Sequence, residues 1–491
     1  MASSFRPSLS WFSPPIESTP DPSPAGMRTV QCTRLDLWGR GAVMTGGFII
    51  DARLDAKILK QTLSTLVEHK FPSAGARLAL RNGAYEFQIP HTFDAGTPPI
   101  AFTAENHSEA YRSATRPALP IHISNSSEPS IHPLPDLDVY FKSKESPSSF
   151  DEFLVPNTPV IHVHVTTFDD LSFIGVTFSH GAFDGLGMRT LLYAWARLLN
   201  GDAIDTIPGM ECDVAPFEAF TGPTTVTTMR GWFEPAQSSW LQRVVRPFMQ
   251  ILWAPKEVVM PHDVTRIVRV PKVFLEESKR EINNNLALQG SSEWVGSSDV
   301  LTAWWYKILY GLRSSEDVTP IHIHLQVDLR DFPIFPGSSI LATPYIHNAL
   351  WTIPVPPIPA NAFRTESLTA LALHFRRAIT AYTDVDGIRA DLHCLFGNPS
   401  KRMAPGPPGS EVLVQSNLRK ARIAGLDFSG ACEGTARVIF ALVEPSAAGK
   451  KMVAYGNGSV LMEDGDAVWM SQGGGVKDWE TLRQNGTVVF I

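Results

Sequence analysis

Residues 160–201 contain the feature that most restricts what this chain can fold into: two strands, a glycine-bounded turn and a helix, in that order. VIHVHVTTF (160–168) alternates apolar and polar residues, as a strand with two unlike faces does. LSFIGVTFS (171–179) is more continuously apolar, which indicates a strand buried inside a sheet. LGMRTLLYAWARLLNG (186–201) has the periodicity of an amphipathic helix that ends at a glycine. This unit predicts an α/β fold.

Further strands and helices follow on both sides of this unit. GGFIIDARLDAKILKQTLSTLVEHKF (46–71) predicts a strand and then a helix capped by Asp55. No repeat of fixed short period is present, which disfavours a solenoid or a propeller. In the second half we expect a helix capped by Ser298 (299–311), a strand (321–329), a helix (367–382) and strands at 436–445 and within 459–472.

The length of 491 residues is more than one hydrophobic core usually organises, so we expect two large domains. Residues 206–262 are rich in Pro, Thr and Trp and lack clean periodicity, which is typical of a crossover between domains. The predicted division is therefore an N-terminal domain over 1–205 and a C-terminal domain over 263–491. Residues 106–150 turn to Ser, Pro and short polar pieces, and we expect loops and edge elements there.

Composition and charge exclude some classes of function. Hydrophobic residues make up 44% of the chain and charged residues 19%, which is typical of a folded globular protein. The formal net charge is -7 and no run of Lys or Arg is present, so nothing in the sequence would neutralise a phosphate backbone. We expect no nucleic-acid partner.

The sequence also bears on where the protein works. Its four cysteines lie far apart, without a CxxC pair, which favours a reducing compartment over a disulfide framework. The N-terminal stretch MASSFRPSLSWFSPP lacks the apolar core of a signal peptide, and we expect a cytoplasmic protein. The most lipophilic stretch, Trp240 to Trp253, is interrupted by charge and proline and is too short to span a membrane. We interpret it as an amphipathic surface or interdomain segment.

Three histidines are followed four residues later by an aspartate, and their context separates them. With 14 histidines in the chain, about one such match is expected by chance, so the HxxxD spacing alone identifies nothing. His132 lies in HPLPD, where two prolines dictate an extended loop. His324 lies in an alternating strand, where four residues span about 13 Å and the two side chains cannot meet. We expect both to be structural.

His180 differs because it ends the buried strand and stands in a turn bounded by Gly181, Gly185 and Gly187, just before the helix. A side chain at the end of a strand can reach a cleft. Imidazole titrates near neutral pH, which suits a base that takes a proton from a hydroxyl or an amine. Asp184, four residues on, can hold the backbone of the turn or an arginine and so fix the imidazole. We expect His180 to be the catalytic base and Asp184 to be architectural.

HGAFDG, which ends at Gly185, resembles the HxxxDG signature of the BAHD acyltransferases and of their fungal relatives of the trichothecene 3-O-acetyltransferase type. Other segments are similar to family motifs in the same order: FPSAGARL to LAGRL, SSDVLTAWWYK to the helix before the second sheet, VDLR to the region of a structural arginine, and YIHNA to YxGNA. The resemblance therefore spans most of the chain. It implies the fold shared with chloramphenicol acetyltransferase and condensation domains: two α/β domains, mixed sheets flanked by helices, and an active site in the channel between them.

The resemblance also implies roles for residues outside the HxxxD turn. Arg330 of VDLR would form a structural ion pair with Asp184. Ser416 of SNLRKARIAGLDFSGA matches the Thr or Ser whose hydroxyl supports the oxyanion. Asp427 and Phe428 match the start of the family's DFGWG and support the assignment.

This chain departs from the family pattern in three places. Leu418 stands where Trp is usual, DFSGA replaces DFGWG, and His347 stands where Gly is usual. We expect these changes to affect a structural motif and the pocket wall. They would therefore alter the substrate class more than the chemistry of His180.

By resemblance the protein would transfer an acyl group from acyl-CoA to a hydroxyl of a secondary metabolite such as a terpenoid, an alkaloid or a polyketide, with acetyl-CoA as the expected donor. His180 would deprotonate the acceptor, which attacks the thioester directly. No metal and no tightly bound cofactor would take part. We expect a monomer whose partners are acyl-CoA and the small acceptor.

Three alternatives stay open at this point. A non-catalytic binding or regulatory protein could use the same fold, although the intact HxxxD turn argues against it. A condensation-type enzyme would take its acyl group from a carrier-protein thioester, and no carrier segment is recognisable in the chain. Two HxH strands, His162/His164 and His322/His324, suggest a zinc or iron site, but no carboxylate or third histidine is identified to complete one.

Overall fold

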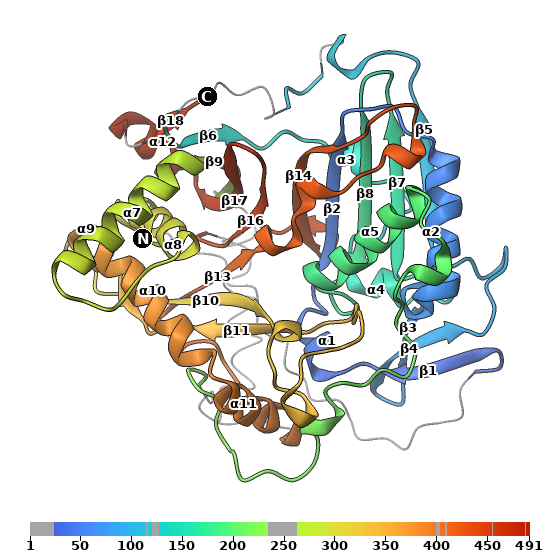
Figure 1. The fold of residues 1–491 in the computed structure, drawn as a ribbon, viewed down its shortest axis with the longest axis horizontal. Helices are drawn as coiled ribbons and strands as arrows, with labels where there is room; N and C mark the ends of the chain where they lie inside the picture. The colour runs from blue at the N-terminus through green and yellow to red at the C-terminus, as the bar shows by residue number, and fades with distance from the viewer. Residues whose placement is uncertain are drawn as a thin grey trace, which may run out of the picture.

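Two large mixed sheets and one small sheet form the framework of the protein, with helices packed on them (Figure 1). The N-terminal stretch MASSFRPSLSWFSPP and the stretch from Trp240 to Trp253 lie outside the residues that the structure describes. The amphipathic segment predicted at Trp240 to Trp253 therefore stays a prediction. The computed structural model describes residues 24–113, 116–119, 127–233, 263–398, 403–407, 410–453, 455–486 and 488–491.

The first large sheet has six strands and carries the strand–turn–helix unit. β7 (Ile161–Thr167) and β8 (Ser172–Ser179) pair as an antiparallel hairpin, and β2 (Val43–Ile50) pairs with the other edge of β8. The helices α2 (Ala56–Lys70) and α5 (Gly185–Leu199) lie side by side on this half of the molecule (Figure 1). In spatial order the strands are β15 (Lys450–Lys451), β14 (Val438–Ala447), β2 (Val43–Ile50), β8 (Ser172–Ser179), β7 (Ile161–Thr167) and β5 (Ala101–Asn106).

The second large sheet has nine strands. The helices α7 (Lys272–Leu288), α8 (Ser297–Tyr310), α10 (Leu368–Tyr382) and α12 (Val476–Asn485) contribute buried side chains to its core. In spatial order the strands are β11 (Leu350–Pro354), β10 (Pro320–Asp328), β13 (Glu411–Asn417), β16 (Gly458–Glu463), β17 (Ala467–Gly475), β9 (Asp263–Pro271), β6 (Ser130–Pro133) and β18 (Val489–Phe490), and β12 (Ile358–Pro359) pairs with β10.

A third, three-stranded sheet and several short helices complete the described fold. The strands are β1 (Met27–Gln31), β4 (Ala84–Pro90) and β3 (Arg77–Arg81), and the helices are α1 (Arg34–Trp38), α3 (Asp138–Phe141), α4 (Phe150–Phe153), α9 (Ala362–Thr365) and α11 (Val385–Gly397).

The two large sheets exchange strands between the halves of the chain. β14, from the second half, pairs with β2, and β6, from the first half, pairs with β9. Each large sheet therefore contains strands from both the N-terminal and the C-terminal half of the chain. A division of the chain into two contiguous domains does not describe this exchange. The crossover between domains predicted at residues 206–262 stays a prediction, because residues 234–262 lie outside the described part of the chain.

Of the two helix caps predicted from the sequence, one is confirmed and one is wrong. Asp55 caps α2 and accepts hydrogen bonds from the backbone amides of Lys57 and Ile58. Ser298 does not cap α8, because that helix already begins after Gly296. The carboxylate of Asp299 reaches back to the amide of Gly296 at 2.7 Å and so starts the helix earlier than the serine suggested.

The strand β7 alternates apolar and polar residues, and the structure buries both of its faces. The short helix α3 lies directly on the first sheet. Gly47 and Gly175, which have no Cβ, leave room there for Phe141. The predicted loops of residues 106–150 thus include a segment that closes one face of the core.

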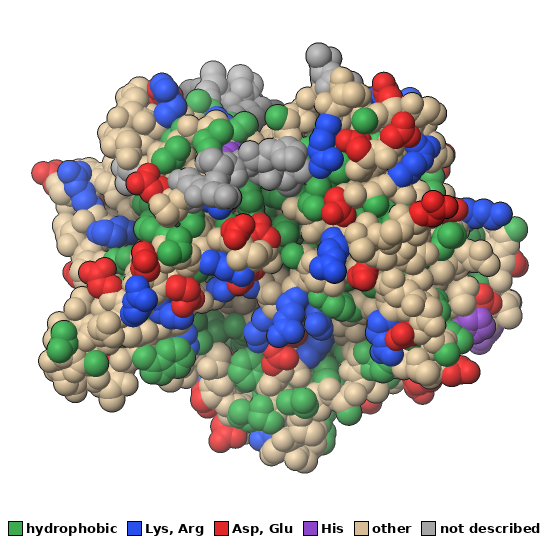
Figure 2. Space-filling model, turned by 45° about the horizontal axis from the view of Figure 1, so that its top comes forward, with side chains coloured by type: hydrophobic (Ala, Val, Ile, Leu, Met, Phe, Trp, Pro, Cys, Tyr) green, Lys and Arg blue, Asp and Glu red, His purple; other side chains and the backbone are tan. Residues whose placement is uncertain are grey.

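Acidic and basic side chains are interspersed over the face of the molecule shown in Figure 2, with a group of Lys and Arg near its centre. No helix within the described ranges is both long enough and apolar enough to cross a membrane. The four cysteines lie within the described ranges, and none of them forms a disulfide bond there.

Candidate active site

His180 stands in the turn between β8 and α5, and both of its backbone groups are hydrogen-bonded. Its N–H donates to the Ala42 carbonyl at 2.9 Å, and its carbonyl accepts from Nδ2 of Asn348 at 3.0 Å. The ring lies against Gly39, where an added Cβ would come 2.8 Å from Cγ and Nδ1 of His180. Nδ1 is buried and has no hydrogen-bond partner within the described residues, so Nε2 is the ring nitrogen left open to a substrate.

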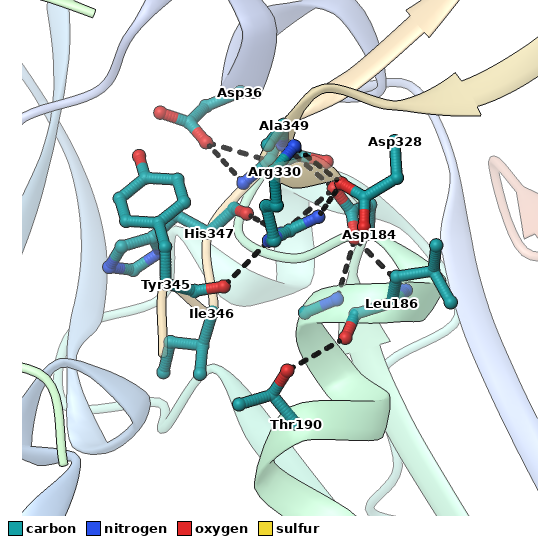
Figure 3. A network of polar contacts seen from close by, with 12 residues as sticks. Asp36, Asp184, Leu186, Thr190, Asp328, Arg330, Tyr345, Ile346, His347 and Ala349 are labelled. Carbon is teal, nitrogen blue, oxygen red and sulfur yellow. Dashed lines mark hydrogen bonds and ion pairs between the residues drawn. The ribbon is translucent and has the colours of Figure 1, made fainter. Parts of the chain in front are cut away.

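Both carboxylate oxygens of Asp184 are occupied by other protein groups (Figure 3). Oδ1 accepts from the backbone amides of Leu186 at 3.0 Å and Gly187 at 2.7 Å, so that Asp184 caps α5. Oδ2 accepts from the amide of Ala349 at 2.7 Å and from Nη2 of Arg330 at 3.1 Å. The side chain is 1% exposed, and its position joins the start of α5 to the second half of the chain.

The structure brings Arg330 and Asp184 together, the pair that the sequence resemblance suggested. Arg330 also donates from Nη1 to Asp328 at 2.8 Å, from Nε to the carbonyl of Tyr345 at 2.8 Å, and from Nη2 to the carbonyl of His347. Burial by itself lowers the pKa of Arg330, but the carboxylates of Asp184 and Asp328 outweigh this effect and raise it above its usual value. A charged guanidinium with four hydrogen bonds therefore joins the turn to the second half of the molecule.

YIHNA (345–349) holds the HGAFD turn (180–184) at three points. The consecutive residues 347–349 contact alternate residues of the HGAFD turn, which fixes this turn along its whole length. The contacts are His347 Nδ1 to the Ala182 carbonyl at 3.0 Å, Asn348 Nδ2 to the His180 carbonyl at 3.0 Å, and the Ala349 amide to Asp184 Oδ2 at 2.7 Å.

The expectation that His347 would shape a pocket wall is wrong. Its ring is 6% exposed and is stacked between Phe87 and Phe183, with centroid distances of 4.6 and 5.6 Å. Burial lowers the pKa of His347, although the carboxylate of Asp36 acts in the opposite direction. His347 therefore fills the core behind the turn and donates to the Ala182 carbonyl from there.

Ser416 lies on β13 and pairs in parallel register with Ser459 of β16. Leu418 follows two residues later and begins a short 3-10 helix after the strand. The Leu418 side chain lies against Gly185, where an added Cβ would come 2.8 Å from it. Ser416 is therefore two residues from a contact with the start of α5.

Asp427 and Phe428 lie at the other end of α5, away from His180. The ring of Phe428 meets Trp195 edge to face at 5.5 Å. The carbonyl of Asp427 accepts from Nδ2 of Asn200, the C-cap of α5, at 2.9 Å. The closing motif therefore holds this helix in place, and its departure from the family pattern affects packing rather than the reacting groups.

The two HxH pairs lie on different sheets, one on β7 and the other on β10. His164 contacts the hydroxyls of Thr103 at 2.8 Å and Thr166 at 3.2 Å. Nε2 of His324 donates to the carbonyl of Pro405 at 2.8 Å. Over the ranges that the structure describes, no group of three or more His, Cys, Asp or Glu side chains is arranged to hold a metal ion.

We expect the buried histidines to make the protein less stable in mild acid. Burial lowers the pKa of His132, His162 and His324 to about 4 in each case. Between about pH 6.5 and 4 the unfolded chain binds these protons while the folded chain does not, so the free energy of unfolding falls as the pH falls. Urea unfolding at pH 7, 6 and 5 measures this slope.

The variant His162→Phe removes one of these titrating imidazoles, so its free energy of unfolding is expected to depend less steeply on pH. The same change at the exposed His69 serves as the control. An unchanged slope in His162→Phe would show that this buried imidazole does not drive the loss of stability.

The structure adds Asp36, Gly39 and Asn348 to the residues around His180, and the sequence pattern did not single these out. Asn348 could have been found, because it belongs to YIHNA, whose resemblance to a family motif was visible. Asp36 and Gly39 carry no comparable signal. They lie well over a hundred residues before His180 and come to it only through the fold.

A family model described as the Transferase family matches residues 141–214, the part of the chain that includes the HxxxD turn. Acetyltransferase adrJ of Penicillium roqueforti is 28% identical over 438 residues, which cover 85% of this chain and 85% of that protein. A further relative, calD of Penicillium decumbens, is 25% identical, covers 81% of each chain and is named a transcriptional regulator.

Among solved structures, TRI101 of F. graminearum, complexed with coenzyme A and deoxynivalenol, matches 94% of this chain and 99% of its own, with a TM-score of 0.63 and 13% identity. At this identity the likeness concerns the fold, which agrees with the two-sheet α/β architecture expected from the sequence. The family model and the curated relatives show that the chain is an acyltransferase similar to the BAHD-type acyltransferase superfamily.

Proposed function

We propose that the protein is an acyl-CoA-dependent O-acyltransferase that acylates a hydroxyl of a secondary metabolite such as a terpenoid, an alkaloid or a polyketide. Acetyl-CoA is the proposed donor, since relatives are named acetyltransferases. The solved structure with coenzyme A and deoxynivalenol supports a CoA thioester and a small hydroxylated acceptor as the two substrates. We also propose that it acts as a monomer.

The observation that carries this proposal is the division of roles within the HGAFD turn. Four N–H donors occupy the two oxygens of Asp184, so this carboxylate is not available to take a proton from a substrate. His180 has its backbone fixed and Nε2 open. A histidine whose backbone is fixed and whose Nε2 is open can take a proton from a bound hydroxyl, as a general base must.

In the proposed reaction, Nε2 of His180 takes the proton of the acceptor hydroxyl as its oxygen attacks the thioester carbonyl. The C–O bond forms and the carbonyl becomes a tetrahedral oxyanion, which a hydrogen-bond donor stabilises. The C–S bond then breaks, and the thiolate of CoA takes the proton back from His180. The products are the ester and free CoA, and no acyl group is attached to the protein.

Arg419 and Lys420 are adjacent basic residues that follow β13, and each forms an ion pair. Arg419 lies 2.6 Å from Glu463, and Lys420 lies 2.6 Å from Asp331. Exposed ion pairs are weak, and an adjacent basic pair on the surface does not by itself identify a phosphate site. The proposal of a CoA donor therefore rests on the comparisons and not on these two residues.

Ser416 is proposed to donate its hydroxyl to the oxyanion. Replacing it with alanine should lower kcat by about 100-fold, the usual effect of removing one oxyanion donor, with little change in KM. The matched control is Ser459→Ala, which removes the neighbouring hydroxyl on the adjacent strand. Equal kcat values for the two variants would argue that a backbone amide performs this role instead.

The function is tested by incubating the protein with a panel of acyl-CoAs and candidate alcohols while the release of free CoA is followed. Acetyl-CoA with a hydroxylated terpenoid, alkaloid or polyketide should give the highest rate. Transfer only from an acyl carrier protein would favour a condensation-type enzyme. A wild-type chain that releases no CoA with any donor would contradict the proposal and favour a regulatory role, as the name of calD suggests.

A further inference from the structure

A short N-terminal segment contacts His180 on several sides, although it is remote from the HxxxD turn in the sequence. Ala42 accepts the hydrogen bond of the His180 amide at 2.9 Å. Gly39 lies behind the ring, so close that an added Cβ would also come 2.8 Å from the His180 carbonyl oxygen. Asp36 reaches the same carbonyl indirectly, through Asn348.

Asp36 holds Asn348 through two hydrogen bonds. Its Oδ1 accepts from the backbone N–H and from Nδ2 of Asn348, both at 3.2 Å. Its Oδ2 accepts from the amide and the hydroxyl of Thr33, both at 2.7 Å. The carboxylate is 1% exposed, and Asn348 is 2% exposed. Nδ2 of Asn348 is thus aimed at the His180 carbonyl by a buried acceptor that cannot turn to solvent.

The helix that carries Asp36 is itself anchored to the second half of the chain. Nη1 of Arg34 donates to the carbonyls of Leu395 and Asn398 at the end of α11. Trp38 meets Trp351 of β11 at a centroid distance of 5.6 Å. α1 therefore lies between the two halves of the molecule. It is fixed to α11 and β11 in the second half, and the residues around it contact the HGAFD turn in the first half.

We propose that Asn348 is a positioning residue for His180 and that Asp36 acts through it, so that α1 determines where the imidazole stands. This inference rests on the proposed role of His180 as the base. A reacting group displaced by about 1 Å can lose about 100-fold in rate, so a hydrogen bond that fixes its backbone acts on turnover without touching the substrate.

The kinetic test uses Asn348→Ala, Asp36→Asn and the double variant of the full chain. Asn348→Ala should lower kcat by about 10- to 100-fold and leave both KM values within about twofold. If Asp36 acts through Asn348, adding Asp36→Asn to Asn348→Ala should cause no further loss of kcat. A double variant with multiplied losses would overturn the proposed route.

Two matched controls separate positioning from stability. Asn283 bonds to the amide and carbonyl of Val295 away from the site, so Asn283→Ala should lower Tm with kcat unchanged. Gly39→Ala should lower kcat because of its contact with the ring, whereas Gly41→Ala has open space around it and should not. If Asn348→Ala keeps wild-type kcat, or loses it only in proportion to Tm as Asn283→Ala does, the positioning role is wrong.

A chemical readout keeps this test independent of turnover. Diethylpyrocarbonate modifies accessible imidazoles, and the rate at the His180 peptide can be compared by mass spectrometry with the rate at the exposed His69. The His180 rate should change in Asn348→Ala and in Gly39→Ala, while the His69 rate stays constant. A wild-type protein without acyl transfer but with this pattern would refute the proposed function and leave the positioning role standing. An unchanged His180 rate in both variants would refute the positioning role.

Discussion

The His180→Ala variant is expected to lose at least about 100-fold in kcat, because general base catalysis contributes about 10²- to 10⁴-fold in enzymes that depend on it. Stability should change by less than about 1 kcal/mol. The turn is held by backbone and by Asp184, and no described residue forms a hydrogen bond with Nε2 of His180. CoA release at saturating donor and acceptor, with Tm measured in parallel, checks both statements.

The control for this experiment is His69→Ala, which removes an exposed histidine and should leave both quantities unchanged. Wild-type turnover in His180→Ala would remove the central claim that this imidazole is the base. A large fall in Tm would instead mean that the ring supports the fold, and the loss of turnover could then not be assigned to proton transfer.

The Arg330→Ala variant should be the most destabilising of the changes considered. It leaves the carboxylates of Asp184 and Asp328, whose side chains are 1% and 9% exposed, without their shared cation. Removing one partner of a buried ion pair costs about 3–5 kcal/mol. Since Arg330 also donates to carbonyls within YIHNA, turnover should fall together with stability. Urea unfolding and kcat on the remaining folded protein provide the measurements.

Arg313→Ala is the matched control, because this arginine pairs with Glu411 at the opposite end of β13 from Ser416. It should lower the free energy of unfolding without a specific loss of kcat.

The variant Asp184→Asn tests the ion pair from the carboxylate side. The amide can still cap α5, but it presents a donor to Arg330 and Ala349 where an acceptor is needed. If Arg330→Ala and Asp184→Asn left activity and stability untouched, the ion pair would have no structural role.

Local sequence signals were enough to identify the elements that frame the site. The alternation of VIHVHVTTF, the apolar run after it and the glycine-bounded turn gave β7, β8 and α5, because strand and helix periods are set by neighbours in the chain. Asp55 capped its helix as expected for the same reason. The cap at Ser298 failed because a competing carboxylate, Asp299, lay one residue away.

The pairing of Arg330 with Asp184 came from motif order and not from any local signal. A sequence lists which charges exist, but the partner of a buried charge depends on which segments the fold brings together. His347 illustrates the limit. A histidine in place of the usual glycine suggested a change in the pocket, and only the stacking between Phe87 and Phe183 placed it behind the turn.

By itself, the sequence determined the strand–turn–helix unit and the position of His180 at its turn, since these depend on residues within a few positions of one another. The tertiary structure alone decided that β14 joins the first sheet and that Asp36, Gly39 and Asn348 surround His180. These contacts join residues more than a hundred positions apart. They form because burying apolar surface brings distant segments into one core, and no short-range pattern encodes which backbone carbonyl a distant amide will then meet.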